Sequence, residues 1–158
     1  MSVWPSLVEI ALSPWGLVLV VAMAAGTAAW IHGRRNPAVH GMFEVAANSK
    51  LLSCDLGKRQ GKIYRCDGLC GSPDAVFRQG KTIIVCDYKD RPMPREHSLY
   101  VRFQMILYMG MMARLFRRHK IEGKVGYRDG VMPISHCEGT YAELIRLIPS
   151  LKQARKKF

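Results

Sequence analysis

The sequence predicts an α/β protein in which an N-terminal transmembrane helix precedes a mixed central sheet flanked by helices. Residues 10–31 (IALSPWGLVLVVAMAAGTAAWI) contain no charged side chain. Short segments rich in β-branched residues, such as residues 81–88 (KTIIVCDY), are typical of strands. Two longer segments, residues 97–119 and 140–157, carry apolar residues at helical spacing. After the span, the expected order of elements is α-β-β-β-α-β-β-α.

The uncharged segment 10–31 is long enough to span a membrane. About 20 apolar residues cross a hydrocarbon core about 30 Å thick, and Trp15 and Trp30 stand near the two ends, where indole rings prefer the headgroup level. A cleavable signal peptide is one alternative, but it needs a basic start where this chain has Glu9. A buried hairpin helix is another, and apolarity on all sides disfavours it.

Basic residues are confined to the part of the chain after the span. All 24 Lys and Arg residues lie at or beyond Arg34, whereas Glu9 alone of the 12 acids precedes it. The positive-inside rule therefore places the N-terminus outside and the basic domain in the cytoplasm, at the cell inner membrane. We expect an anchor at residues 1–35 and one domain at residues 36–158. Its charge favours nucleic-acid phosphates or anionic lipid headgroups as partners.

The five cysteines lack the regular spacing of a disulfide framework and suit a reducing cytosol. Cys66 and Cys70 are expected on the same face of one strand. A zinc site needs four ligands, and no second close pair of cysteines exists. Small buried apolar residues are therefore the preferred interpretation of these cysteines.

The expected elements of the domain follow from local signals. Asn36-Pro37 lets a helix begin over residues 38–52, with His40 and Glu44 one turn apart. Gln79-Gly80 reads as a turn between strands. Further strands and helices are expected at residues 62–70, 73–78, 81–88, 97–119, 124–127, 131–134 and 140–157.

Two acids fall on strands that we expect to be neighbours. Asp74 and Asp87 lie on consecutive antiparallel strands, so their carboxylates are expected side by side at one edge of the sheet. Like charges that close are unfavourable unless a cation sits between them. Carboxylates together with a backbone carbonyl, here that of Tyr88, and water are the ligands that Mg²⁺ and Mn²⁺ prefer. Lys89 shares a strand face with Asp87 and reaches the same spot.

This cluster suits phosphodiester hydrolysis. A divalent ion lowers the pKa of bound water, and with Lys89 it offsets the charge that builds on the phosphate. Lys89 is also placed to orient the attacking water or to help deprotonate it. An isolated Asp-x-Lys is equally a solvated strand end, so the surrounding motifs decide between the two interpretations.

Three motifs together resemble the RecB-like branch of the PD-(D/E)XK nuclease superfamily: Gly71-x-x-Asp74, Asp87-x-Lys89 at the end of an apolar strand, and Gln104-x-x-x-Tyr108 on the next helix. The CRISPR-associated RecB-like exonucleases are similar. The resemblance covers about residues 63–134. It implies a restriction-endonuclease-like core and a deoxyribonuclease that requires Mg²⁺ or Mn²⁺. The catalytic residues it implies are Asp74, Asp87, Lys89, Gln104 and Tyr108.

The family also places a histidine on the helix before the sheet, where it joins the metal shell. His40 is the matching residue, and Glu44 one turn on is an alternative ligand. Iron–sulfur members carry one cysteine before the core and three after it, whereas only Cys137 follows it here. No iron–sulfur cluster is therefore expected.

Arginines after the active strand are the expected contacts to DNA phosphates: Arg91, Arg95 and Arg102. The expected partners are thus DNA, the membrane with its anionic lipids, and other proteins of a membrane DNA-handling or defence system. Two non-enzymatic functions remain as alternatives. One is an inactive module of the same fold that tethers DNA, and the other is a membrane-surface scaffold.

Overall fold

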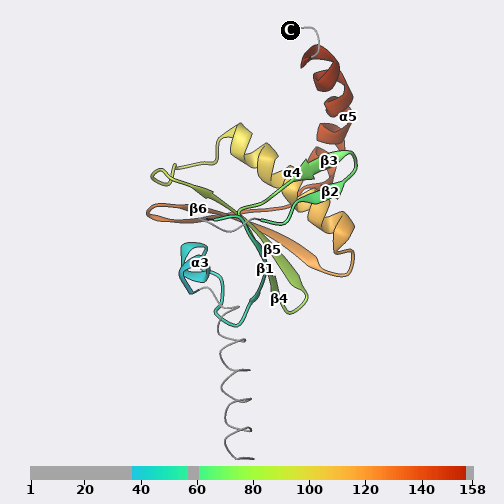
Figure 1. The fold of residues 1–158 in the computed structure, drawn as a ribbon. Helices are drawn as coiled ribbons and strands as arrows, with labels where there is room; N and C mark the ends of the chain where they lie inside the picture. Colours follow the sequence, from blue (N-terminus) through green and yellow to red (C-terminus); the bar gives the residue numbers. More distant parts are fainter. Residues whose placement is uncertain (1–36, 57–60, 156–158) are drawn as a thin grey trace, which may run out of the picture. The chain divides into compact units, whose positions relative to one another are not determined.

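The computed structural model of the chain describes residues 37–56 and 61–155. The predicted membrane span, residues 10–31, lies outside the described residues. Among the helices within the described ranges, none has the length and apolarity needed to cross a membrane. The described part has the predicted class, with a central mixed sheet flanked by helices (Figure 1).

A five-stranded sheet organises the domain, with strand order β1-β4-β5-β6-β7. Its strands are β1 (Lys50–Cys54), β4 (Ala75–Gln79), β5 (Thr82–Lys89), β6 (Lys120–Tyr127) and β7 (Gly130–Ile134). Neighbouring strands are antiparallel except β5 and β6, which run parallel. A parallel pair needs a crossover connection, and α4 (Leu99–Leu115) supplies it. The predicted strands at 73–78, 81–88, 124–127 and 131–134 are confirmed, with β6 beginning four residues early.

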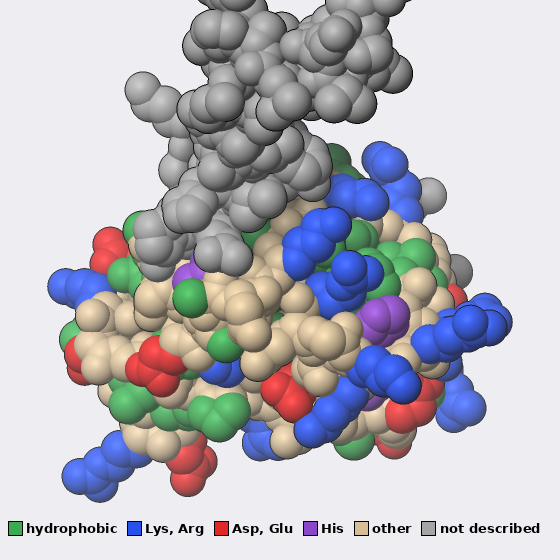
Figure 2. Space-filling view, turned by 90° about the horizontal axis from the view of Figure 1, so that it is seen from below, with side chains coloured by type: hydrophobic (Ala, Val, Ile, Leu, Met, Phe, Trp, Pro, Cys, Tyr) green, Lys and Arg blue, Asp and Glu red, His purple; other side chains and the backbone are tan. Residues whose placement is uncertain are grey.

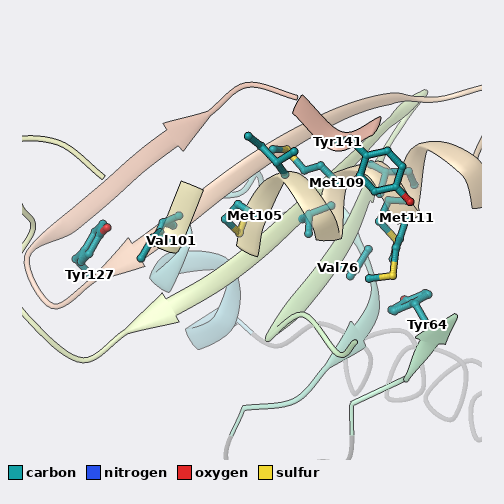
Figure 3. Packing of buried hydrophobic residues seen from close by; sticks show 13 residues of the cluster. Tyr64, Val76, Val101, Met105, Met109, Met111, Tyr127 and Tyr141 are labelled. Atoms are coloured by element: carbon teal, nitrogen blue, oxygen red, sulfur yellow. The ribbon is translucent and has the colours of Figure 1, made fainter. Parts of the chain in front are cut away.

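The two faces of the sheet bury different clusters. Helix α4 covers one face, with α5 (Glu138–Arg155) packed against α4, and the short α3 (Pro37–Met42) lies on the other face (Figure 1). On β5, Ile83 and Val85 pack under α4, whereas Ile84 and Cys86 point to the α3 side. Figure 3 shows the α4 side, where residues of the helix lie over the strands. This alternation also decides the face on which the polar residues at the end of β5 emerge.

A separate hairpin stands beside α4, in place of the single strand predicted over residues 62–70. It consists of β2 (Tyr64–Cys66) and β3 (Leu69–Gly71), which pair only with each other. Asp67 and Gly68 form its turn with φ of 51° and 74°, the left-handed pair that a tight hairpin turn requires. Cys66 and Cys70 therefore lie on different strands, the first half-buried and the second exposed. The prediction that they share a face of one strand is wrong.

The turn of this hairpin is held by α5. Tyr141 is buried, and its hydroxyl donates to Asp67 Oδ2 over 2.7 Å. The Tyr141 ring occupies the space beside Gly110 of α4, where any β-carbon would collide with it. Arg114 adds ion pairs to Asp67 and Glu138. The contacts of Tyr141 thus join α4, α5 and the hairpin.

The helix predicted over residues 38–52 is mostly wrong. Helix α3 ends at Met42, Glu44 adopts a φ of 48°, and residues 50–54 form β1. Phe43 and Val45 are buried against the α3 side of the sheet, and β1 pairs with β4. A short apolar segment reads equally as helix or strand, and here the pairing with β4 decides.

Helix α4 fills most of the predicted segment 97–119, and Ser98 caps it by accepting the Val101 amide. The helix is apolar on almost every side, so its sequence does not define a single buried face. Its buried residues are Val101, Met105, Ile106, Met109, Gly110, Met111 and Met112. Leu99, Phe103 and Leu115, which are also apolar, are exposed. Apolar side chains therefore remain on the solvent side of α4.

Candidate active site

Asp87 emerges at the end of β5 on the face that α4 covers. The side chain is buried, with 4% of the residue exposed. Its Oδ1 accepts a hydrogen bond from Gln104 Nε2 at 3.2 Å, and its Oδ2 lies 2.7 Å from Lys89 Nζ. A buried carboxylate of this kind is costly unless cations or donors face it. Both are present here, on the same strand and on α4.

Gln104 connects the residues of this group. It donates to Asp87, accepts from Lys89 Nζ over 3.1 Å, and lies 3.5 Å from the Tyr108 hydroxyl. The two α4 residues are one turn apart, so both face the end of β5. Burial is the main cause of a raised pKa for the Tyr108 phenol, which therefore stays protonated at neutral pH.

Gly71 explains how Tyr108 fits beside the hairpin. A β-carbon at Gly71 would lie 2.6 Å from Cε1 of the Tyr108 ring. The glycine of the Gly-x-x-Asp motif is therefore needed for the close approach of β3 to α4. Substitution here would move the ring that Gln104 contacts.

Asp74 comes directly before β4 and joins the group from the next strand. The ladder pairs Ala75 with Cys86, which puts Asp74 and Asp87 one step further at the same end. Asp74 Oδ2 accepts the Tyr88 amide at 2.6 Å. Burial raises the pKa of the Asp74 carboxyl, and the nearby charge of Asp87 raises it further. The two carboxylates predicted to converge are therefore close enough to interact.

A third acid, Asp55, lies at the same end of the sheet and was not anticipated. Cys54 pairs with Ala75, and the Asp55 amide donates to the Asp74 carbonyl at 2.7 Å. Asp55, Asp74 and Asp87 thus follow one another across β1, β4 and β5. The charge of Asp55 also raises the pKa of Asp74. Nothing in the sequence marked Asp55, because its position depends on the pairing of β1 with β4.

We expect Asp74→Asn to stabilise the fold at neutral pH. Because the pKa of Asp74 is raised, the folded state holds its proton more tightly than the unfolded state does. The wild-type protein therefore loses stability as the pH rises from the ordinary Asp pKa through the raised pKa. An amide removes that cost and still accepts the Tyr88 amide. Urea unfolding at several pH values measures the difference in stability between Asp74→Asn and the parent. The variant should be more stable by the full amount above the raised pKa, and the difference should vanish in acid. Destabilisation of the variant at neutral pH would contradict this expectation.

His40 does not join the group. Its ring packs against Phe77, with centroids 4.8 Å apart, and its Nε2 lies 2.9 Å from the Ser49 carbonyl oxygen. Phe77 belongs to the cluster on the α3 side of the sheet, opposite the face that carries Asp87. Glu44 is exposed beyond the end of α3, where its carbonyl accepts from Lys124. The metal role expected for His40, and the alternative at Glu44, therefore have no support from their positions.

The predicted DNA-contacting arginines line two different hollows along α4. Arg91 lines one of about 440 Å³ together with Lys89, the residue that pairs with Asp87. Arg95 and Arg102 line another of about 710 Å³, on the side of α4 that faces β7 and the start of α5. On the face seen in Figure 2, Lys and Arg side chains are interspersed with acids rather than gathered in one basic patch.

The structure thus brings Asp74, Asp87, Lys89, Gln104 and Tyr108 together, with Arg91 nearby. No protein-family model matches the chain, and no curated protein or solved structure resembles it at a significant level.

Proposed function

We propose that the domain from residue 36 onward is a Mg²⁺- or Mn²⁺-dependent nuclease of the PD-(D/E)XK superfamily, RecB-like branch, which hydrolyses DNA phosphodiester bonds. The observation that carries the proposal is the convergence of two acids, a lysine, a glutamine and a tyrosine from β4, β5 and α4. Lys89 Nζ lies 2.7 Å from Asp87 and 3.1 Å from Gln104. All five side chains come from the motifs that carry the resemblance.

The donors at the end of β5 fit a hard divalent cation. Asp74 and Asp87 are neighbours whose charges repel, and this repulsion adds to the burial that raises the pKa of Asp74. A cation between them would relieve this repulsion, and the main-chain carbonyl of Tyr88 is a further oxygen donor of the preferred kind. Such an ion, when bound, supplies an activated water and offsets charge on the phosphate.

The protein side chains have distinct tasks in this proposal. Lys89 places a positive charge beside the carboxylates, where it can stabilise the phosphate and orient the attacking water. Gln104 fixes both Asp87 and Lys89, so it is a positioning residue. The protonated Tyr108 hydroxyl is a donor for a phosphate oxygen. Arg91 extends the positive charge along the path of the DNA backbone.

The proposal also includes a place in the cell. The composition of residues 10–31 and the basic residues that follow support a single span at the inner membrane, with the nuclease domain in the cytoplasm. Anionic lipids would then face a strongly basic domain. A nuclease held there acts on DNA brought to the membrane. Its expected partners are proteins of a membrane DNA-handling or defence system.

Cleavage by the full-length chain in detergent tests the proposal. Linear single-stranded, linear duplex and covalently closed circular DNA are incubated with Mg²⁺, Mn²⁺ or chelator. We expect cleavage with either metal and none in chelator, and attack on the circle identifies an endonuclease. Equal cleavage in chelator, or none under any condition, would overturn the proposal.

One observation favours a second function, an inactive module that tethers DNA. Lys89 already faces Asp87 within an internal hydrogen-bond network, so the charge of Asp87 itself is balanced without an added cation. Such a module binds DNA without turnover in Mg²⁺ or Mn²⁺. The same incubations, combined with a binding measurement, separate the two functions.

A further inference from the structure

A hollow of about 350 Å³ lies between the hairpin β2–β3 and helix α4. Gln104 and Tyr108 line one part of it, so it shares two residues with the candidate site. The hairpin supplies Leu69 and Cys70 as the opposite wall. The hollow thus lies next to the candidate site.

Two aromatic side chains of α4 border this hairpin hollow without being buried. Tyr100 is 73% exposed and Phe103 is 40% exposed. Leu107 and Met111 complete an apolar lining. Exposed rings beside an apolar hollow leave π-faces free to stack on a planar ligand.

Each of the two neighbouring hollows contains two cationic side chains and one acid. Tyr100 also borders the hollow that contains Lys89 and Arg91. Phe103 also borders the one that contains Arg95 and Arg102. Each of the two rings therefore borders both the apolar hollow and a hollow that contains two cationic side chains. A nucleotide likewise joins an apolar base face to an anionic phosphate.

We propose that the hairpin hollow binds one unstacked nucleobase of the strand whose phosphate lies at Asp74 and Asp87, a subsite that rests on the proposed function. Tyr100 and Phe103 stack on the base, and Lys89 and Arg91 hold an adjoining phosphate. A base inside a duplex is covered by its neighbours above and below, so its face can meet these rings only after it leaves the stack.

Oligonucleotide binding to the full-length chain in detergent and chelator tests the subsite without requiring cleavage. A series of single-stranded oligonucleotides carries one abasic nucleotide at successive positions. We expect one position at which loss of the base weakens binding about tenfold. Tyr100→Ala should weaken binding of the intact oligonucleotide by a similar factor. In this variant, loss of the base at that position should cause no further loss of affinity. Tyr100→Phe keeps the ring and should bind within about twofold of the parent.

Leu115→Ala is the matched control, because Leu115 is an exposed apolar residue at the far end of α4. It should leave the affinities for the intact and for the abasic oligonucleotide unchanged. Three results would each overturn the subsite. The abasic nucleotide could weaken binding equally in the parent and in Tyr100→Ala, it could have no position-dependent effect in the parent, or the protein could bind no oligonucleotide at all. If Tyr100→Ala removes the effect of the abasic position but the protein does not cleave DNA in Mg²⁺, only the proposed nuclease is overturned. If the protein cleaves DNA but Tyr100→Ala does not remove that effect, only the subsite is overturned.

Discussion

Asp87→Asn is expected to abolish metal-dependent DNA cleavage, with a rate loss of roughly a thousandfold or more. The buried Asp87 carboxylate faces Lys89 on one oxygen and Gln104 on the other. The amide keeps its size but removes the charge that a cation and Lys89 require. Lys89→Met should cause a comparable loss, because it removes the positive charge next to the phosphate. Initial rates on labelled DNA in Mg²⁺ measure both.

Asp90→Asn is the control for this experiment. Asp90 follows β5 directly, but it is exposed and pairs with Arg128 at 3.2 Å. Its replacement should leave cleavage unchanged, which shows that loss of an acid near the site is not sufficient. Thermal unfolding of each variant separates an effect on chemistry from an effect on folding. Cleavage at the parental rate by both Asp87→Asn and Lys89→Met would refute the assignment of the site.

Gly110→Ala is expected to lower the free energy of unfolding by about 2 kcal/mol. In an open helix the same change stabilises by up to about 1 kcal/mol, because alanine loses less backbone entropy than glycine. Here the new β-carbon would collide with the buried ring of Tyr141, which cannot move without releasing Asp67. Chemical denaturation monitored by circular dichroism measures the difference.

Gly139→Ala is the matched control, since a β-carbon there meets no atom within 4 Å and the residue lies in the first turn of α5. It should be neutral or slightly stabilising. Tyr141→Leu in the Gly110→Ala background should recover part of the loss, because a smaller side chain leaves space for the methyl group. If Gly110→Ala were as stable as the parent, the close packing of α4 against α5 would be wrong.

The strands and the motif residues could be read from the sequence where local and tertiary preferences agree. The β-branched run Thr82–Val85 forms a buried strand on both faces, and its alternation places Asp87 and Lys89 on one face. Gln104 and Tyr108 follow from helical spacing. The convergence of Asp74 with Asp87 required only the tight turn at Gly80, whose φ is 57°.

Other features depend on contacts that a linear pattern does not contain. Residues 50–54 become a strand only because β4 offers a partner, and the same pairing brings Asp55 beside Asp74. The exposed rings of α4 could not be identified, because the helix is apolar around most of its circumference. The turn at Asp67-Gly68 is different: this dipeptide favours left-handed backbone at both positions, a local signal that the prediction of one strand over residues 62–70 missed.

The converging side chains all lie between positions 74 and 108, within the hairpin β4–β5 and the helix that follows it. Contacts of such short sequence separation carry a small loop-closure entropy, and chains rich in them fold quickly. The pairing of β7 with β6 is more local still, because Tyr127 pairs with Gly130. No side chain of the group comes from β6, β7 or α5. Substitutions in β7 should therefore change the stability of the fold more than the arrangement of the acids and Lys89.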